Sequence, residues 1–76
     1  MEFRIQLRSA EDVRDFVAIA TRRAFPVIVT NHQHEVNGKN FMEMFSLDVS
    51  RVLWVTAQCS GEEFEALKRD AARFLV

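Results

Sequence analysis

The stretch VLWVTAQC, residues 52–59, is the most strand-like segment of the chain and decides the fold. Its side chains alternate with the period of two that is typical of a strand with one covered face. The side chains expected on that face are Leu53, Val55, Ala57 and Cys59. Gly61 then ends the strand, and glutamates from Glu62 onwards predict the start of a helix, because the helix dipole favours negative charge there. The apolar stripe expected for this helix is Phe64, Leu67, Ala71, Phe74 and Leu75.

Towards the N-terminus, residues 2–8 alternate in the same way and predict a second half-buried strand. Ser9 follows, with Asp12 three residues later, which resembles the capping box of a helix N-terminus. The amphipathic stripe that continues from this cap consists of Val13, Phe16, Val17 and Ala20. Pro26 ends the predicted helix, because a proline cannot donate the next helical hydrogen bond.

Between the two helices, residues 26–30 are rich in β-branched side chains and predict another strand. A polar turn at residues 31–33 leads into a short edge strand at residues 34–38. We prefer this turn to one at Asn37–Gly38, a pair that favours hairpin turns, because the apolar cluster from Phe41 does not alternate like a strand. That cluster instead predicts a short helix within residues 41–47, with Asn40 as its N-cap.

The predicted order is therefore β-α-β-β-α-β-α, within a single domain of residues 1–76. Each long helix carries one apolar stripe, so both helices are expected to cover the same face of one sheet. The opposite face would stay open and would present Trp54, with Ile28 beside it from the neighbouring strand.

The composition of the chain argues against nucleic-acid-binding, membrane-spanning and secreted proteins. Ten basic and eleven acidic residues give a formal charge of −1, and no basic excess indicates binding to nucleic acid or to an anionic membrane. No apolar run reaches the length of about 18 residues that would span a bilayer, and the alternating start MEFRIQLR is not a signal peptide. The single cysteine, Cys59, cannot form an internal disulfide, which predicts a reducing cytoplasm.

Several stretches, in this order and spacing, resemble a known family. They are FVAIA (16–20), FPVIV (25–29), VNGKNFMEMFSL (36–47) and VTAQCSGEE (55–63). Together they are similar to HPr, the histidine-containing phosphocarrier of the bacterial sugar phosphotransferase system. The resemblance implies an α/β (α+β) fold, an open-faced β-sandwich of order βαββαβα. Its four-stranded sheet would be antiparallel, with three helices on one face.

The resemblance also places the family's functional positions on this sequence. Counting back from Phe16 without gaps, the phosphorylated histidine falls on Ser9. The arginine of the same motif falls on Glu11 and its proline on Asp12, while the family's regulatory serine falls on Asn40. A phosphohistidine needs an imidazole nucleophile and donors that neutralise the phosphoryl charge, and serine and glutamate provide neither. The sequence therefore predicts a fold without the phosphotransfer site.

Partner choice is expected to differ as well. The family's partners are acidic where they meet the first helix, and here Glu11, Asp12 and Asp15 make that helix acidic too. Because electrostatic matching sets partner choice, binding to the usual phosphotransfer partners is disfavoured.

The short helix is the strongest remaining indication of function. In the family this surface is an apolar patch that docks partners, and the matching side chains here are Phe41, Met42 and Phe45. Aromatic residues and methionine are also enriched at interface cores. The alternative is that all apolar residues of this helix pack in the core. We expect Met44 and Leu47 inside and part of the remainder exposed.

Other residues carry weaker hypotheses. Trp54 and Ile28 on the open sheet face could form a homodimer surface, or Trp54 could be an isolated aromatic shielded by its neighbours. His32 and His34 form an H-x-H pattern, but without a convincing third ligand they are interpreted as solvated turn residues rather than a metal site. Cys59 is interpreted as a buried structural residue of the core face.

These observations predict a non-catalytic HPr-like regulatory or protein-binding domain that uses its short helix to contact a protein. Two alternatives stay open: a divergent phosphocarrier that uses Ser9, or a histidine elsewhere, as acceptor, and a self-associating structural module. An enzyme is not expected, because no acid–base pair, phosphate-binding glycine loop or metal set is present in the sequence, and no cofactor is expected either.

Overall fold

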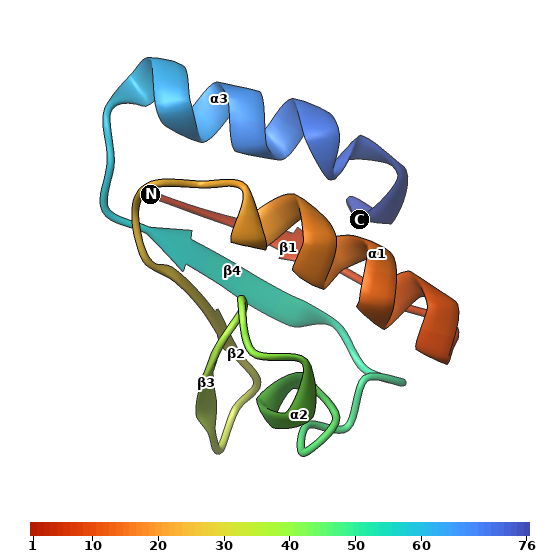
Figure 1. Ribbon diagram of the computed structural model, residues 1–76. Coiled ribbons are helices and arrows are strands. Elements are labelled where there is room, and N and C mark those ends of the chain that lie inside the picture. The colour runs from red at the N-terminus through yellow and green to blue at the C-terminus, as the bar shows by residue number, and fades with distance from the viewer.

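The computed structural model describes residues 1–76 and has the predicted order of elements (Figure 1). A short 3₁₀ turn, η1, extends the chain after the last helix. The elements are β1 (Glu2–Ile5), α1 (Ala10–Thr21), β2 (Val27–Thr30), β3 (Glu35–Asn37), α2 (Phe41–Met44), β4 (Leu53–Ala57), α3 (Gly61–Asp70) and η1 (Ala72–Phe74).

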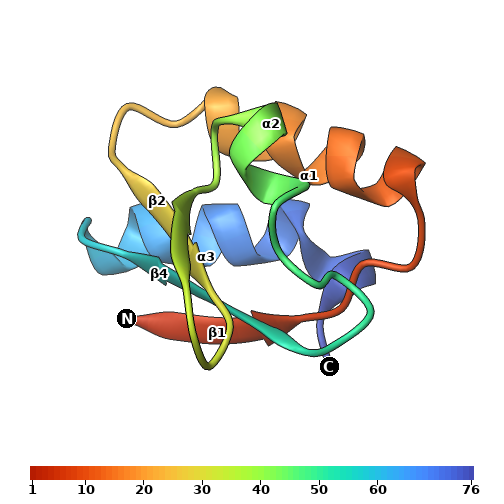
Figure 2. The same cartoon turned by 90° about the horizontal axis from the view of Figure 1, so that it is seen from below.

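The four strands form one antiparallel sheet in the order β1-β4-β2-β3, which confirms the prediction. The segment VLWVTAQC therefore contains a central strand, β4, flanked by β1 and β2. One row of side chains runs across the whole sheet, because Phe3 lies opposite Val55, Val55 opposite Val29, and Val29 opposite Val36. All four are buried beneath the helices, which lie on one side of the sheet (Figure 2).

The core is entirely apolar. Nineteen hydrophobic residues are buried in one cluster, and no polar or charged side chain is buried with them. Phe16 of α1 packs edge-to-face on Phe74 of η1, with ring centroids 6.3 Å apart, so the first and last helical elements meet over the sheet. The predicted stripe of α1 needs one correction. Ile19 is buried and Val17 is half-buried, so the buried face of α1 consists of Val13, Phe16, Ile19 and Ala20.

Side-chain caps fix where the later helices begin. Ser60 and Glu63 form a reciprocal capping box at α3, with the Ser60 hydroxyl accepting from the Glu63 N–H at 3.1 Å and the Glu63 carboxylate accepting from the Ser60 N–H at 2.9 Å. At α2 the Asn40 side chain accepts from the Glu43 N–H at 3.0 Å, as predicted for the N-cap. Each cap satisfies backbone donors that the first turn leaves free.

The preferred hairpin is also confirmed. β2 and β3 are joined through residues 31–34, and the side chain of Asn31 organises the turn by accepting from the N–H groups of Gln33 and His34, both at 2.7 Å. Gly38 instead ends β3, where its N–H donates to the Val27 carbonyl at 2.7 Å.

The last helix ends earlier than predicted. α3 stops at Asp70, and Leu75, expected on its stripe, forms an antiparallel bridge with Ile5 instead. Further backbone bonds join the Gln6 N–H to the Phe74 carbonyl at 2.8 Å and the Val76 N–H to the Arg4 carbonyl at 3.2 Å. Residues 74–76 thus pair with the end of β1 on its outer side.

The opposite edge of the sheet is occupied by a side chain. The N–H of Asn37 in β3 donates to the Glu43 carboxylate of α2 at 3.0 Å. None of the three α-helices is both long and apolar enough to cross a membrane.

Candidate functional site

The start of α1 is a capped helix terminus whose hydroxyl is already engaged. Ser9, which the resemblance aligns with the family's phosphorylated histidine, has an extended backbone, and its hydroxyl accepts from the Asp12 N–H at 3.1 Å. The capping box expected here is not closed. The Asp12 carboxylate accepts from the Arg8 N–H at 2.9 Å, one residue before Ser9. Asp12 thus tethers the four-residue connection between β1 and α1, residues 6–9, rather than closing the cap itself.

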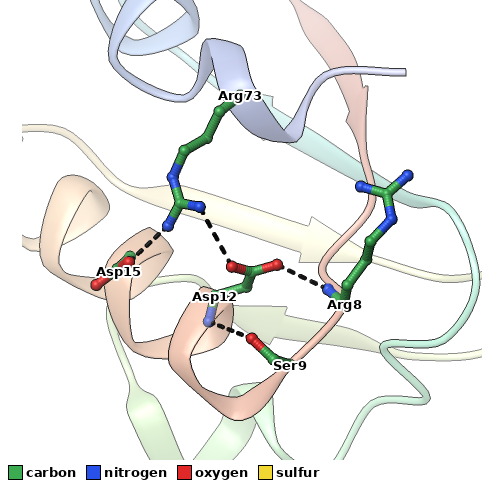
Figure 3. A network of polar contacts seen from close by, with 5 residues as sticks. All are labelled: Arg8, Ser9, Asp12, Asp15 and Arg73. Atoms are coloured by element: carbon green, nitrogen blue, oxygen red, sulfur yellow. Dashed lines mark hydrogen bonds and ion pairs between the residues drawn. The ribbon is translucent and has the colours of Figure 1, made fainter.

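An arginine from the far end of the chain covers this acidic terminus (Figure 3). One terminal nitrogen of Arg73 lies 3.3 Å from the Asp12 carboxylate, and the other lies 2.5 Å from the Asp15 carboxylate. The guanidinium also lies over the ring of Phe74, 4.2 Å from its centroid. Arg73 was missed in the sequence analysis, and no local signal could have found it, because 61 residues separate it from Asp12.

The chemistry available at this terminus is limited. The only hydrogen bond of the Ser9 hydroxyl is the one it accepts from a backbone N–H, so no side chain acts as its base. Glu11 is exposed, and Asp12 and Asp15 already share one arginine. An incoming phosphoryl group would therefore meet carboxylates and no free positive charge from Arg73.

The second candidate surface is α2 with the residue that follows it. Met44 and Leu47 are buried, as expected. Met42 is 77% exposed and Phe45 is 44% exposed, two of only four large apolar side chains that are exposed in the chain. Phe41 is half-buried and packs edge-to-face on Phe45, with ring centroids 4.7 Å apart. We call Phe41, Met42 and Phe45 the α2 patch.

Contacts below the α2 patch hold the helix in place. Glu43 reaches across to the Asn37 N–H of β3, and the Ser46 hydroxyl donates to the Glu43 carbonyl at 2.6 Å. α2 also packs against α1. Asn40, the residue aligned with the family's regulatory serine, uses its side chain as the N-cap of this helix.

The residues predicted for the open face are partly covered. Trp54 lies opposite Thr30 and Ile28 opposite Thr56, so the two are diagonal neighbours, and both side chains are half-buried. The His32 ring packs edge-to-face on the Trp54 indole, with centroids 4.9 Å apart. His32 lies in the turn, as predicted, but its contact with Trp54 was not predicted, because it forms only when the turn folds back over β4. Self-association through this face stays a prediction.

The remaining predicted residues are placed as follows. His32 and His34 are both exposed in the turn between β2 and β3, and no three potential ligands gather into a metal-binding group with them or with Glu35. The interpretation of Cys59 as a buried residue of the core face is wrong. β4 ends at Ala57, so the strand alternation no longer applies, and Cys59 is half-buried at the margin of the core.

Comparison with known proteins identifies the fold. The sequence matches no protein-family model and no curated protein. Among solved structures it is similar to HPr-C-His from Thermoanaerobacter tengcongensis, with 24% identity, a TM-score of 0.73, and coverage of 95% of this chain and 96% of that one. It is also similar to the phosphocarrier protein HPr from Bacillus anthracis, with 25% identity, a TM-score of 0.78, and coverage of 97% and 95%. The chain has the fold of these HPr phosphocarriers over nearly its whole length.

Proposed function

We propose that the chain is a non-catalytic relative of the phosphotransferase-system phosphocarrier that binds a protein partner through the α2 patch and carries no phosphoryl group. The observation that carries this proposal is the split within α2 between a fully buried Met44 and a Met42 that is 77% exposed beside the Phe41–Phe45 pair. Exposed apolar side chains gathered on one fixed element are typical of interaction sites.

Preorganisation supports the docking role. The Asn40 cap, the Glu43 carboxylate on β3 and the buried Met44 hold α2 in a single place. A partner would therefore meet a formed surface and would lose little free energy to ordering it, and methionine and aromatic side chains contribute large contact areas.

The start of α1 supports the absence of phosphotransfer. The Ser9 hydroxyl has no base, Glu11 adds a negative charge, and Arg73 is committed to Asp12 and Asp15. The only histidines, His32 and His34, lie in the β2–β3 turn and not on α1. The same acidic helix would repel partners that are themselves acidic at this contact.

The first experiment tests phosphotransfer directly. The purified chain is incubated with phosphoenolpyruvate and enzyme I of the phosphotransferase system, and separately with ATP and the HPr kinase, and its intact mass is measured. We expect an unmodified mass in both reactions. A gain of one phosphoryl group from phosphoenolpyruvate would refute the proposal and favour the second candidate, a divergent phosphocarrier, which the HPr fold itself supports.

The second experiment tests the α2 patch. Met42→Glu and Phe45→Glu each place a charge on the patch, and Val76→Glu is the matched control, because Val76 is also an exposed apolar residue (51%) but lies at the end of the chain beside β1. Proteins captured by the unmodified chain and by Val76→Glu, but lost with both patch variants, would be partners. Each is then titrated as a purified protein. Capture that is unchanged in the patch variants, with circular dichroism showing an intact fold, would remove α2 as the docking surface.

The same proposal places the protein in the bacterial cytoplasm, where its single cysteine needs no disulfide partner, and assigns it no enzymatic activity and no cofactor. Self-association through Trp54 and Ile28 is the third candidate. A monomeric solution mass at high protein concentration would remove it.

A further inference from the structure

The largest hollow in the molecule lies at the end of the sheet and not at α1 or α2. Three segments form it: the end of β1, the β2–β3 turn, and the connection that enters β4, which gather along the lower edge of the sheet in Figure 2. Its volume is about 550 Å³, within the range of about 300–1,000 Å³ that small-molecule sites occupy. Its lining includes the side chains of Gln6, Asn31, Gln33, Asp48, Arg51 and Trp54.

Backbone contacts hold three of the polar side chains in fixed orientations. The Gln6 amide nitrogen donates to the Ser50 carbonyl at 3.0 Å, which leaves the amide oxygen as a free acceptor. The Asn31 oxygen is taken by two turn N–H groups, which leaves its NH₂ group as a free donor. Asp48 accepts from the Ser50 N–H at 3.1 Å and from the Ser50 hydroxyl at 2.5 Å.

The charges in this cavity balance. Arg51 lies 3.5 Å from the Asp48 carboxylate, so the two formal charges cancel. The hydrogen bonds from Ser50, with the nearby Arg51 charge, hold the pKa of Asp48 below its usual value, and the pair therefore persists at neutral pH. Gln33 adds a carboxamide that makes no hydrogen bond within the protein. The pair adds no net formal charge to the lining. The free amide oxygen of Gln6, the free NH₂ group of Asn31 and the Gln33 carboxamide offer both donors and acceptors to a neutral molecule with hydroxyl groups.

An aromatic surface completes the site. Val52 and the Trp54 indole form the apolar part of the lining, and the His32 ring packs edge-to-face against the indole. Indole surfaces next to directed hydrogen-bonding groups suit a ring that is apolar on its faces and polar around its rim. We propose that this cavity binds a neutral polyhydroxylated ring, a saccharide, which stacks on Trp54 and bonds to Gln6, Asn31 and Gln33.

Trp54 also provides the assay, because the chain contains one tryptophan and no tyrosine. Its fluorescence is followed while the full chain is titrated with a fixed panel of neutral hexoses, N-acetylhexosamines and disaccharides, and separately with inorganic phosphate. Backbone amide shifts of Gln33 and Arg51, measured by NMR, give a second readout. We expect saturable binding of at least one saccharide with a Kd of about 1–10 mM, as suits a half-open site.

Two glutamine variants separate the cavity from the remainder of the sheet. Gln33→Ala removes a side chain that makes no internal bond and should weaken binding by about two- to tenfold, the value of one lost hydrogen bond. Gln58→Ala, an exposed glutamine outside this cavity, should leave the Kd unchanged. The proposal is overturned if no saccharide of the panel gives a saturable response in either readout, if both variants bind alike, or if phosphate binds more tightly than every saccharide.

Discussion

The packing before α2 can be tested by replacing Gly38 with alanine, with the same substitution at Gly61 in α3 as the control. Gly38 lies between β3 and α2, and a Cβ atom built on it would lie 3.0 Å from Val27 Cγ1, 3.1 Å from the Val27 carbonyl oxygen and 3.1 Å from Val29 Cγ2. Carbon atoms pack best at about 3.5–4.0 Å. Val27 and Val29 are completely buried, so neither can move aside. Gly61, the first residue of α3, has no atom within 4 Å of its Cβ position.

The free energies follow from these contacts. Neither glycine has a positive φ, so alanine can adopt both backbones and the difference between the sites is steric. At Gly38, overpacking costs about 1–3 kcal/mol, of which about 0.4–1 kcal/mol is recovered because alanine reduces the entropy of the unfolded chain. A mid-range net loss of about 1.3 kcal/mol lowers the melting temperature by about 5–10 °C. Gly61→Ala meets no steric cost and keeps only the gain of about 0.4–1 kcal/mol from the lower entropy of the unfolded chain, so it should raise the melting temperature by about 2–8 °C.

Urea unfolding followed by the fluorescence of Trp54, together with thermal unfolding by circular dichroism, measures both variants against the unmodified chain. We expect opposite signs at the two sites. A Gly38→Ala variant as stable as Gly61→Ala would refute the reasoning, because it would mean that β2 does not approach residue 38 and that the connection into α2 is looser than described.

Three further predictions concern contacts outside α2. A double-mutant cycle of Arg73→Ala and Asp15→Asn should give a coupling free energy of about 0.2–1 kcal/mol, as for other exposed ion pairs, and a coupling of zero would show that Arg73 does not hold α1. Ser60→Ala removes the capping box of α3 and should cost about 0.5–2 kcal/mol in urea unfolding, whereas Ser60→Asp should retain most of that stability. The hydrogen bond from Arg23, helped by the charges of neighbouring arginines, lowers the pKa of Asp70 below 3.8; its contribution to stability is therefore present above pH 3.8 and lost as the pH falls below that value. Asp70→Asn should therefore be less stable than the unmodified chain at pH 7. Its free energy of unfolding should fall less than that of the unmodified chain between pH 7 and pH 2, and equal pH profiles in urea unfolding would contradict this.

Features that depend on neighbouring residues were predictable from the sequence. The alternation of apolar and polar side chains predicts β4, and the caps at Ser9 and Asn40 lie next to the helices that they start. The burial of Met44 and Leu47 followed from the limit on how many sides of a short helix can be covered. In each case the deciding interactions lie within one turn or one strand, so a local pattern is sufficient.

Features that depend on distant residues were not predictable. α3 ends at Asp70 because residues 74–76 pair with β1, near the opposite end of the sequence, and helical periodicity through Leu75 gives no sign of that competition. The contacts of Arg73 with Asp12 and Asp15 and of His32 with Trp54 have the same origin. The cavity beside Trp54 draws on three segments, each of which resembles an ordinary polar loop when considered alone.

Both borders of the sheet are engaged, and this has a consequence for behaviour in concentrated solution. Free backbone groups on an edge strand act as a template on which another chain can add a strand, and this is a common route to aggregation. Residues 74–76 bond to the Arg4 carbonyl and the Gln6 N–H at the end of β1, and the Glu43 carboxylate accepts from the Asn37 N–H on the three-residue β3. Each border of the sheet therefore offers other chains fewer free backbone groups than a bare edge strand would, and this lowers the tendency to uncontrolled strand exchange.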